Sequence, residues 1–176
     1  TLYGNDFGLS AIPGFIKGGE YILHMVGPSC LPFNFGDSGS RMRLNTSLFW
    51  FARKTKNPAL LRNECKLLLE IPNYDYEQYR RMLPSIFVLG KDINLANLPK
   101  PKVDMFAAKN EAPVCLMRSS WKEDAIYVGI KGGKASANTH THLDAGSFVM
   151  DAQGVRWAVD LGPQEYNSLE SKGIAL

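Results

Sequence analysis

The apolar residues in the first half of the chain recur at intervals of three and four, as on one face of an amphipathic helix. Residues 12–25 carry such a stripe, which ends before Gly27. A second stripe follows the loop 31–39, and either Asp37 or Ser40 is the expected N-cap of its helix. The pattern therefore predicts two helices separated by one loop.

A third helix is predicted from Asn57-Pro58, because an N-cap residue followed by proline at the first helical position is a strong start signal. Its apolar stripe runs through residues 60–69. Two helices joined by so short a link are antiparallel neighbours, which predicts a helical hairpin. Residues 94–103 contain two prolines and have the composition of a linker.

Beyond this linker the apolar period becomes two, which is typical of strands. Residues 114–119 and 125–131 form a predicted hairpin around the polar turn 122–124. In residues 155–161 apolar side chains alternate with mostly polar ones, as in a strand with one buried face. Helices first and strands later predicts an α+β protein with two segregated regions.

The hairpin 147–161 has a loop from which a register can be predicted. Residues 152–154 fit a three-residue loop that ends on glycine, where a positive φ is required. This register places Asp151 opposite Val155, and even-numbered residues of the first strand then share a face with Asp160. The residues expected on that face are His140, His142, Asp144 and Asp160.

Composition and charge exclude some classes of function. The chain has 176 residues, of which 45% are hydrophobic and 21% charged, and its net charge is +3 with scattered basic residues. This is the profile of an ordinary globular protein without an electrostatic footprint for nucleic acid. No apolar run approaches the roughly 20 residues needed to span a bilayer. The three cysteines are far apart and form no metal-binding or redox pair.

The polar residues of the predicted shared face are the main candidates for chemistry. Alternate residues of a strand lie about 7 Å apart, so the two imidazoles do not easily enter one compact site. His142 and Asp160 together would supply two zinc ligands, whereas zinc usually takes three or four protein ligands. The spacing alone leaves two interpretations, a metal site with a missing ligand or ordinary polar strand residues.

Other patterns have simpler explanations. Residues 36–39, Gly-Asp-Ser-Gly, match a serine-protease nucleophile loop, but their helical surroundings favour a turn and a helix N-cap. Residues 129–133 lack phosphate-loop spacing and are interpreted as a strand-terminating turn. Aromatic residues could stack on sugar rings, although such residues more often belong to a core. They are Phe49, Trp50, Phe51, Tyr74, Tyr76 and Tyr79.

Three runs, residues 127–133, 138–148 and 157–162, carry a family resemblance. The middle run reads His-x-His-x-Asp followed by Ser-Phe, and the last contains Asp-x-Gly. Together they resemble the heparinase II/III-like polysaccharide lyases. The loop 33–38 is also similar to a loop at the end of that family's helical toroid. The resemblance is strongest over residues 121–166.

The resemblance implies a domain division and an activity. Residues 1–90 would be the C-terminal helices of an (α/α) toroid, and residues 91–176 the start of an antiparallel β-sandwich. The implied reaction is β-elimination on an acidic, uronate-containing polysaccharide such as heparin, heparan sulfate or alginate. A base removes the proton α to the uronate carboxylate, and an acid assists departure of the glycosidic oxygen.

The resemblance also implies roles for single residues. His140 would be the active-site histidine of the β domain, and His142 and Asp160 would be two ligands of a structural zinc. Asp144 would support the site, and Tyr166 would line the substrate cleft. The family's catalytic tyrosine and third zinc ligand are expected before residue 1 and after residue 176. We therefore expect the isolated chain to be inactive even if the full-length protein is a lyase.

Two other classes of function stay open. The same fold could serve as a non-catalytic carbohydrate-binding module, because a fold does not fix a function. A metal-dependent hydrolase could also use His140, His142 and Asp160 around a metal with an open position. The expected partners are the polysaccharide and the rest of the parent chain, with no nucleic acid and no membrane, and a homo-oligomer stays open. The family implies a periplasmic or secreted bacterial protein.

Overall fold

The computed structural model describes residues 4–69, 81–109, 111–133 and 142–174. Contacts divide the chain into two compact units. The first, here called the helical unit, comprises residues 1–26 and 42–106. The second, here called the sheet unit, comprises residues 27–41 and 107–176. Both helices and an antiparallel sheet are present, so the predicted α+β class is confirmed.

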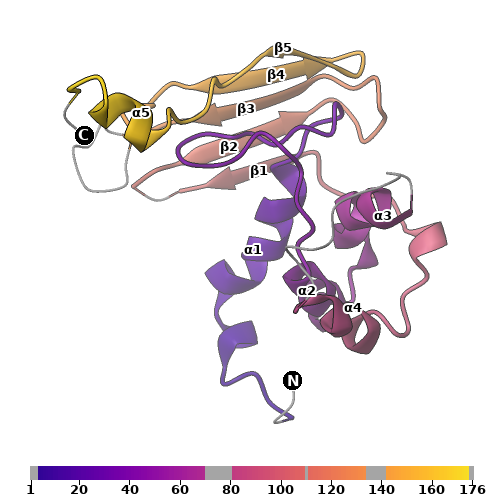
Figure 1. Ribbon diagram of the computed structural model, residues 1–176. Coiled ribbons are helices and arrows are strands. Elements are labelled where there is room, and N and C mark those ends of the chain that lie inside the picture. The colour runs from indigo at the N-terminus through magenta and orange to yellow at the C-terminus, as the bar shows by residue number, and fades with distance from the viewer. Residues whose placement is uncertain (1–3, 70–80, 110, 134–141, 175–176) are drawn as a thin grey trace. The chain divides into compact units, whose positions relative to one another are not determined.

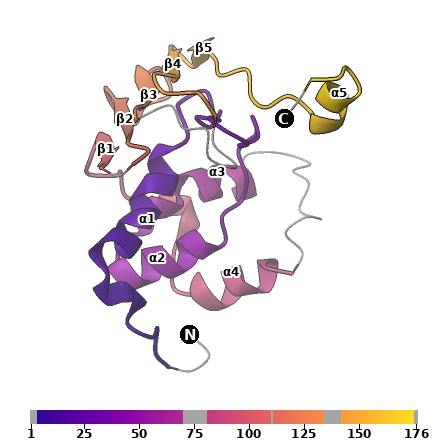
Figure 2. The same ribbon diagram turned by 90° about the vertical axis from the view of Figure 1, so that its left-hand side faces the viewer.

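The helical unit is built around an apolar core, and α1 and α2 pack against each other within it (Figure 2). A Cβ at Gly19 of α1 would come 3.0 Å from the Cβ of Phe51 in α2, so glycine permits this close approach. None of the described helices is long and apolar enough to cross a membrane. The elements are η1 (Leu9–Ala11), α1 (Pro13–His24), α2 (Ser47–Thr55), η2 (Pro58–Leu61), α3 (Arg62–Leu69), α4 (Leu83–Leu89) and η4 (Leu95–Asn97).

The helix predictions are right in place and partly wrong in their starts. The predicted helix 12–25 is confirmed as α1. The second helix begins at Ser47, after Thr46, rather than after Asp37 or Ser40, because residues 27–41 pack within the sheet unit. Asn57 precedes a 3₁₀ turn that leads into α3, and its side chain makes no capping bond.

Glu64 of α3 is buried in the helical unit, with a relative exposure of 2%. One carboxylate oxygen accepts a hydrogen bond from the Asn45 amide at 3.4 Å. The other oxygen is buried and has no hydrogen-bond partner among the described residues. This desolvation raises the pKa of the Glu64 carboxyl to about 8.

The sheet unit contains a five-stranded sheet in the order β1-β2-β3-β4-β5 (Figure 1). Its strands from β2 onward pair antiparallel with their neighbours in sequence. The predicted hairpin around residues 122–124 is confirmed as β2 and β3. The bounds are β1 (Met105–Ala108), β2 (Val114–Arg118), β3 (Tyr127–Lys131), β4 (Phe148–Ala152) and β5 (Val155–Ala158), and a short helix α5 (Tyr166–Glu170) follows.

The loop between β4 and β5 has two residues, so the predicted three-residue loop is wrong. Gln153 and Gly154 both have positive φ, 53° and 74°, as in a type I′ turn. Asp151 therefore lies opposite Arg156 and not opposite Val155. A bulge follows, and Met150 pairs with Ala158. The bulge shifts the register by one further residue, which a prediction from loop length alone does not include.

One face of the sheet is covered by residues 27–41, here called the clasp segment, which runs across the strands in purple in Figure 1. Phe33 is fully buried and lies over Gly129 of β3, where a Cβ would come 2.8 Å from the phenyl ring. Gly129 therefore lies inside strand β3 and makes room for an aromatic ring. Of the glycines that were interpreted as a strand-terminating turn, only Gly132 and Gly133 follow the strand. Tyr127 and Val149 are fully buried.

Strand β5 buries its polar side chain and exposes its apolar ones. The Arg156 side chain is 6% exposed, whereas Trp157 is 65% exposed. The strand also ends at Ala158, before the predicted end at Leu161. The alternation therefore predicts a strand correctly. Its buried face is the one that carries Arg156, because this side chain pairs with the buried Asp151.

Candidate functional site

The clasp segment brings a carboxylate to one of the predicted site residues. His142 Nε2 lies 3.2 Å from Asp37 Oδ1. Asp37 sits in a turn closed by the hydrogen bond from the Ser38 amide to the Phe35 carbonyl, and Gly36 in this turn has φ +62°. Both side chains of the pair are accessible, 33% for His142 and 49% for Asp37. The turn therefore presents the carboxylate to the imidazole at the surface of the sheet unit.

The same segment contacts the second predicted ligand. Asn34 is 3% exposed, and its Nδ2 donates to the backbone carbonyl of Asp160 at 3.1 Å. The Asp160 carboxylate accepts from the Gly162 amide at 2.9 Å. This short-range bond orients the carboxylate just after β5, while Asn34 fixes the backbone that carries it.

A buried ion pair anchors the other end of the clasp segment. Asp151 is fully buried, pairs with Arg156 Nε, and accepts from Ser29 N at 3.0 Å and Ser29 Oγ at 2.6 Å. Arg156 also donates to the carbonyls of Pro32 at 3.1 Å and Leu31 at 2.8 Å. One ion pair on the sheet thus satisfies four polar groups of the clasp segment.

The clasp segment also leaves no room for a side chain at its first residue. A Cβ at Gly27 would come 2.1 Å from Asp151 Oδ2, a distance that no side chain can adopt without rearrangement. The backbone therefore approaches the carboxylate directly. This contact and the hydrogen bonds from Arg156 fix the clasp segment from residue 27 to residue 32. Asn34 and Asp37 lie beyond this fixed part.

Asp144 has a partner of its own. Its carboxylate pairs with Lys131 of β3, and the two side chains are only 11% and 12% exposed. The Lys131 ammonium also lies 5.3 Å from the Phe35 ring centroid. Phe35 of the clasp segment therefore adds a cation–π contact beside the Lys131–Asp144 pair. The other Asp144 oxygen is buried without a hydrogen bond among the described residues.

The described residues of the predicted common face, His142, Asp144 and Asp160, do not lie on one regular strand pairing. Strand β4 begins at Phe148, and a turn with Gly146 at φ +92° joins Asp144 to Ser147. This turn interrupts the alternation on which the prediction depended. His142, Asp144 and Asp160 are held instead by separate partners, Asp37, Lys131 and Asn34.

Two predicted residues give less information. His140 lies outside the described residues. Tyr166 is the first residue of α5, which places it in a helix shortly after β5. Their predicted roles, in catalysis and in lining the cleft, stay predictions.

The donor set for a metal consists of His142 and Asp160. Within the part of the chain that the structure describes, no group of three or more His, Cys, Asp or Glu side chains could hold a metal ion. The two residues nevertheless have the chemistry that zinc uses, a neutral imidazole and a carboxylate. The contact of His142 with a carboxylate is also the usual environment of a metal-ligating histidine. They fit a zinc ion only together with a further ligand.

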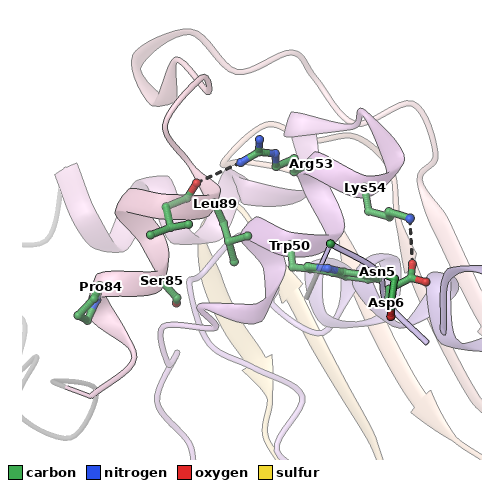
Figure 3. A pocket seen from close by; sticks show the side chains of 10 residues that line it. Asn5, Asp6, Trp50, Arg53, Lys54, Pro84, Ser85 and Leu89 are labelled. Atoms are coloured by element: carbon green, nitrogen blue, oxygen red, sulfur yellow. Dashed lines mark hydrogen bonds and ion pairs between the residues drawn. The ribbon is translucent and has the colours of Figure 1, made fainter. Parts of the chain in front are cut away.

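A separate groove of about 910 Å³ lies in the helical unit (Figure 3). Its cations are already engaged, since Lys54 pairs with Asp6 at 2.8 Å and Arg53 donates to the Val88 carbonyl at 3.1 Å. The hydrogen bond from Lys54, followed by that of Ser10, holds the pKa of Asp6 well below its usual range. The groove is lined by residues 4–6, Trp50, Arg53, Lys54, Pro84, Ser85, Val88 and Leu89.

The aromatic residues proposed for sugar stacking divide into three groups. Phe49 and Phe51 are buried in the core of the helical unit, at 0% and 8% exposure, which excludes them as stacking platforms. Trp50 lines the groove of Figure 3. Tyr74, Tyr76 and Tyr79 lie outside the described residues.

Sequence reasoning missed the polar contacts of the clasp segment. Asp37 and His142 are 105 residues apart, and Asn34 and Asp160 are 126 residues apart. No local pattern signals a contact over that distance. The one signal in the sequence is that residues 33–38, like residues 138–148 and 157–162, resemble parts of the same family.

No protein-family model matches the chain, and no curated protein matches it. The residues and contacts described above therefore carry the functional proposal.

Proposed function

We propose that this chain is part of a polysaccharide lyase that cleaves a uronate-containing polysaccharide by β-elimination. The observation that carries the proposal is the meeting of two distant regions. Residues 33–38 and the runs 138–148 and 157–162 each resemble the heparinase II/III-like lyases, and these regions contact each other through Asn34–Asp160 and Asp37–His142. Motifs that resemble one family and also touch in space are consistent with a common site.

The proposed chemistry needs a base, an acid and stabilisation of negative charge. A base removes the proton α to the uronate carboxylate, and an acid donates a proton to the departing glycosidic oxygen. His140 is the proposed contribution of the sheet unit, because an imidazole can hold or release a proton near neutral pH. Fixed polar groups around the site lower the energy of the developing enolate.

In this proposal His142 and Asp160 hold a zinc ion together with a histidine expected after residue 176. Zinc in a closed site contributes folding energy and does not take part in the reaction. The helical unit then corresponds to the end of an (α/α) toroid, and the five-stranded sheet to the start of a β-sandwich. The substrate is an acidic polysaccharide of the heparin, heparan sulfate or alginate kind. The proposed location of the protein is a bacterial periplasm or the outside of the cell.

Ultraviolet absorbance of unsaturated uronate products tests this function. The full-length protein that contains this chain is incubated with heparin, heparan sulfate, hyaluronan and alginate. We expect absorbance to rise on one of them, and His140→Ala to lower the rate by a factor of roughly 10²–10⁴, the usual worth of a general acid or base. The matched control is Lys122→Ala, an exposed residue in the turn between β2 and β3, which should leave the rate unchanged.

The same assay separates the other functions. Absence of product from folded, zinc-loaded protein on all four substrates, with retained binding to one of them, would favour a carbohydrate-binding module. Cleavage that yields saturated ends and stops on zinc removal would favour a metal-dependent hydrolase, because hydrolysis adds water and leaves no double bond. Either result would refute elimination.

A further inference from the structure

We infer that Asp37 is a positioning residue that fixes the imidazole of His142 for metal binding. The inference rests on the proposed function, because it assigns a supporting carboxylate to its proposed zinc site. It depends on the contact between Asp37 Oδ1 and His142 Nε2 at 3.2 Å and on the way the clasp segment is held.

The first step concerns the imidazole. A histidine ring has two nitrogens, and a metal binds the one that carries no proton. A carboxylate at Nε2 keeps the proton there and leaves Nδ1 as the nitrogen with a free electron pair. Metal-ligating histidines are usually held in this way by a carboxylate or a carbonyl on their other nitrogen. Asp37 therefore selects both the protonated nitrogen and the orientation of the ring.

The second step concerns the rigidity of the carboxylate. Asp37 follows Gly36, whose φ of +62° permits the turn that directs the aspartate towards His142. Earlier residues of the clasp segment are fixed by Arg156, which donates to the Leu31 and Pro32 carbonyls. Asp37 is thus placed by the backbone in advance, and little further ordering is needed when a metal binds.

The third step concerns the second ligand. Asn34, three residues before Asp37, is almost fully buried and binds the backbone of Asp160. The clasp segment therefore contacts both proposed ligands. Asp37 contacts the side chain of His142, and Asn34 contacts the main chain of Asp160. A contact made only for stability would not need to involve both, and the accessible Asp37–His142 pair is of a kind that adds little to stability.

Zinc affinity of the full-length protein, measured by competition with a chromophoric chelator, tests the inference. We expect Asp37→Ala to weaken zinc binding 10–100-fold, as is usual for a residue that orients a metal ligand. The matched control is Ser38→Ala, an exposed neighbour in the same turn, which should bind zinc like the wild type. In a His142→Ala background, Asp37→Ala should have no additional effect, because its target is gone. The metal-free Asp37→Ala variant should melt at the wild-type temperature.

Three outcomes would overturn the inference. Equal zinc affinity in Asp37→Ala and wild type would show that the carboxylate does not position His142. A loss as large as that of His142→Ala would make Asp37 a ligand itself. A wild type that binds no stoichiometric zinc would remove the metal site, while the elimination assay would still decide the proposed function. Zinc binding that depends on Asp37, in a protein without elimination on any substrate, would support the inference and refute the lyase.

Discussion

Glu64 couples the stability of the helical unit to pH. Its pKa is about 8 when buried in the folded protein, compared with an ordinary value of 4.5. Between these values the folded state retains a proton that the unfolded state has lost. The contribution of Glu64 to the free energy of unfolding is therefore highest below about pH 4.5. This contribution falls as pH rises towards 8.

Glu64→Gln should remove this dependence. The amide cannot ionise, so the variant should gain stability relative to the wild type as pH rises from 5 to 8, by at most about 1.4 kcal/mol for each pH unit. Urea unfolding at pH 5, 6, 7 and 8 measures the difference. The control is Glu20→Gln in α1, whose glutamate is accessible and faces Lys17. Parallel pH profiles for Glu64→Gln and wild type would contradict the assigned ionisation.

Gly36 is a second residue with a measurable conformational role. Its φ of +62° is unfavourable for other residues, although a Cβ there would meet no atom within 4 Å. Gly36→Ala should therefore cost roughly 1–2 kcal/mol from backbone strain alone. Gly14→Ala in α1 is the matched control, because it also has open space but a helical backbone, and it should stabilise by up to about 1 kcal/mol. Chemical denaturation compares the two, and a loss of the same size at both glycines would exclude backbone strain as the cause.

At the scale of elements, the pair Asp151–Arg156 joins the hairpin β4–β5 to the clasp segment. Arg156→Ala should destabilise the protein by about 3–5 kcal/mol, because it leaves Asp151 charged, buried and without its counter-ion. The double variant Asp151→Leu/Arg156→Met should lose less, since it leaves no buried charge. Arg41→Ala, at an accessible position, should be nearly neutral. A double variant less stable than Arg156→Ala would refute this account, and thermal unfolding provides the measurement.

Elements with a strong local signal could be predicted, and those fixed by distant contacts could not. Helix α1 and the hairpin β2–β3 follow their apolar periods, so the sequence indicates both. The start of α2 was misplaced because Asp37 looks like an N-cap, whereas its carboxylate contacts His142 within the sheet unit. Strand β5 was identified, but its buried face depends on Asp151, which no local pattern reveals.

The sequence names candidate residues for the site but not their arrangement. The family resemblance proposes His142 and Asp160 as ligands, and this assignment stays a prediction. Their supports, Asp37 and Asn34, come from a segment more than 100 residues earlier in sequence. The bulge after Met150 and the turn at Gly146 also change the face on which each side chain lies. Strand register and turn type decide which side chains share a face. A shift of one residue in the register moves every side chain of a strand to the opposite face.

At the scale of the whole molecule, neither unit is a continuous stretch of chain. The sheet unit needs residues 27–41 as well as residues 107–176. Residues 107–176 expressed alone should fail to fold, because Tyr127, Gly129 and Asp151 would lose the segment that covers them. A fusion that adds residues 27–41 through a flexible linker should recover a dispersed amide NMR spectrum. The same fusion with Phe33→Asp is the control and should stay unfolded, whereas a well-dispersed spectrum from residues 107–176 alone would contradict the assigned role of the segment.

The same division affects the order of events while the chain is being made. Ser29 and its partner Asp151 are separated by 122 residues. At a synthesis rate of about 5–20 residues per second, the clasp segment waits roughly 6–24 s on the ribosome before its partner strand exists. For most of that time the apolar side chain of Phe33 also lacks strand β3, which it covers in the folded protein. A nascent chain of this protein therefore offers a chaperone a binding site that disappears when the strands of the sheet have left the exit tunnel.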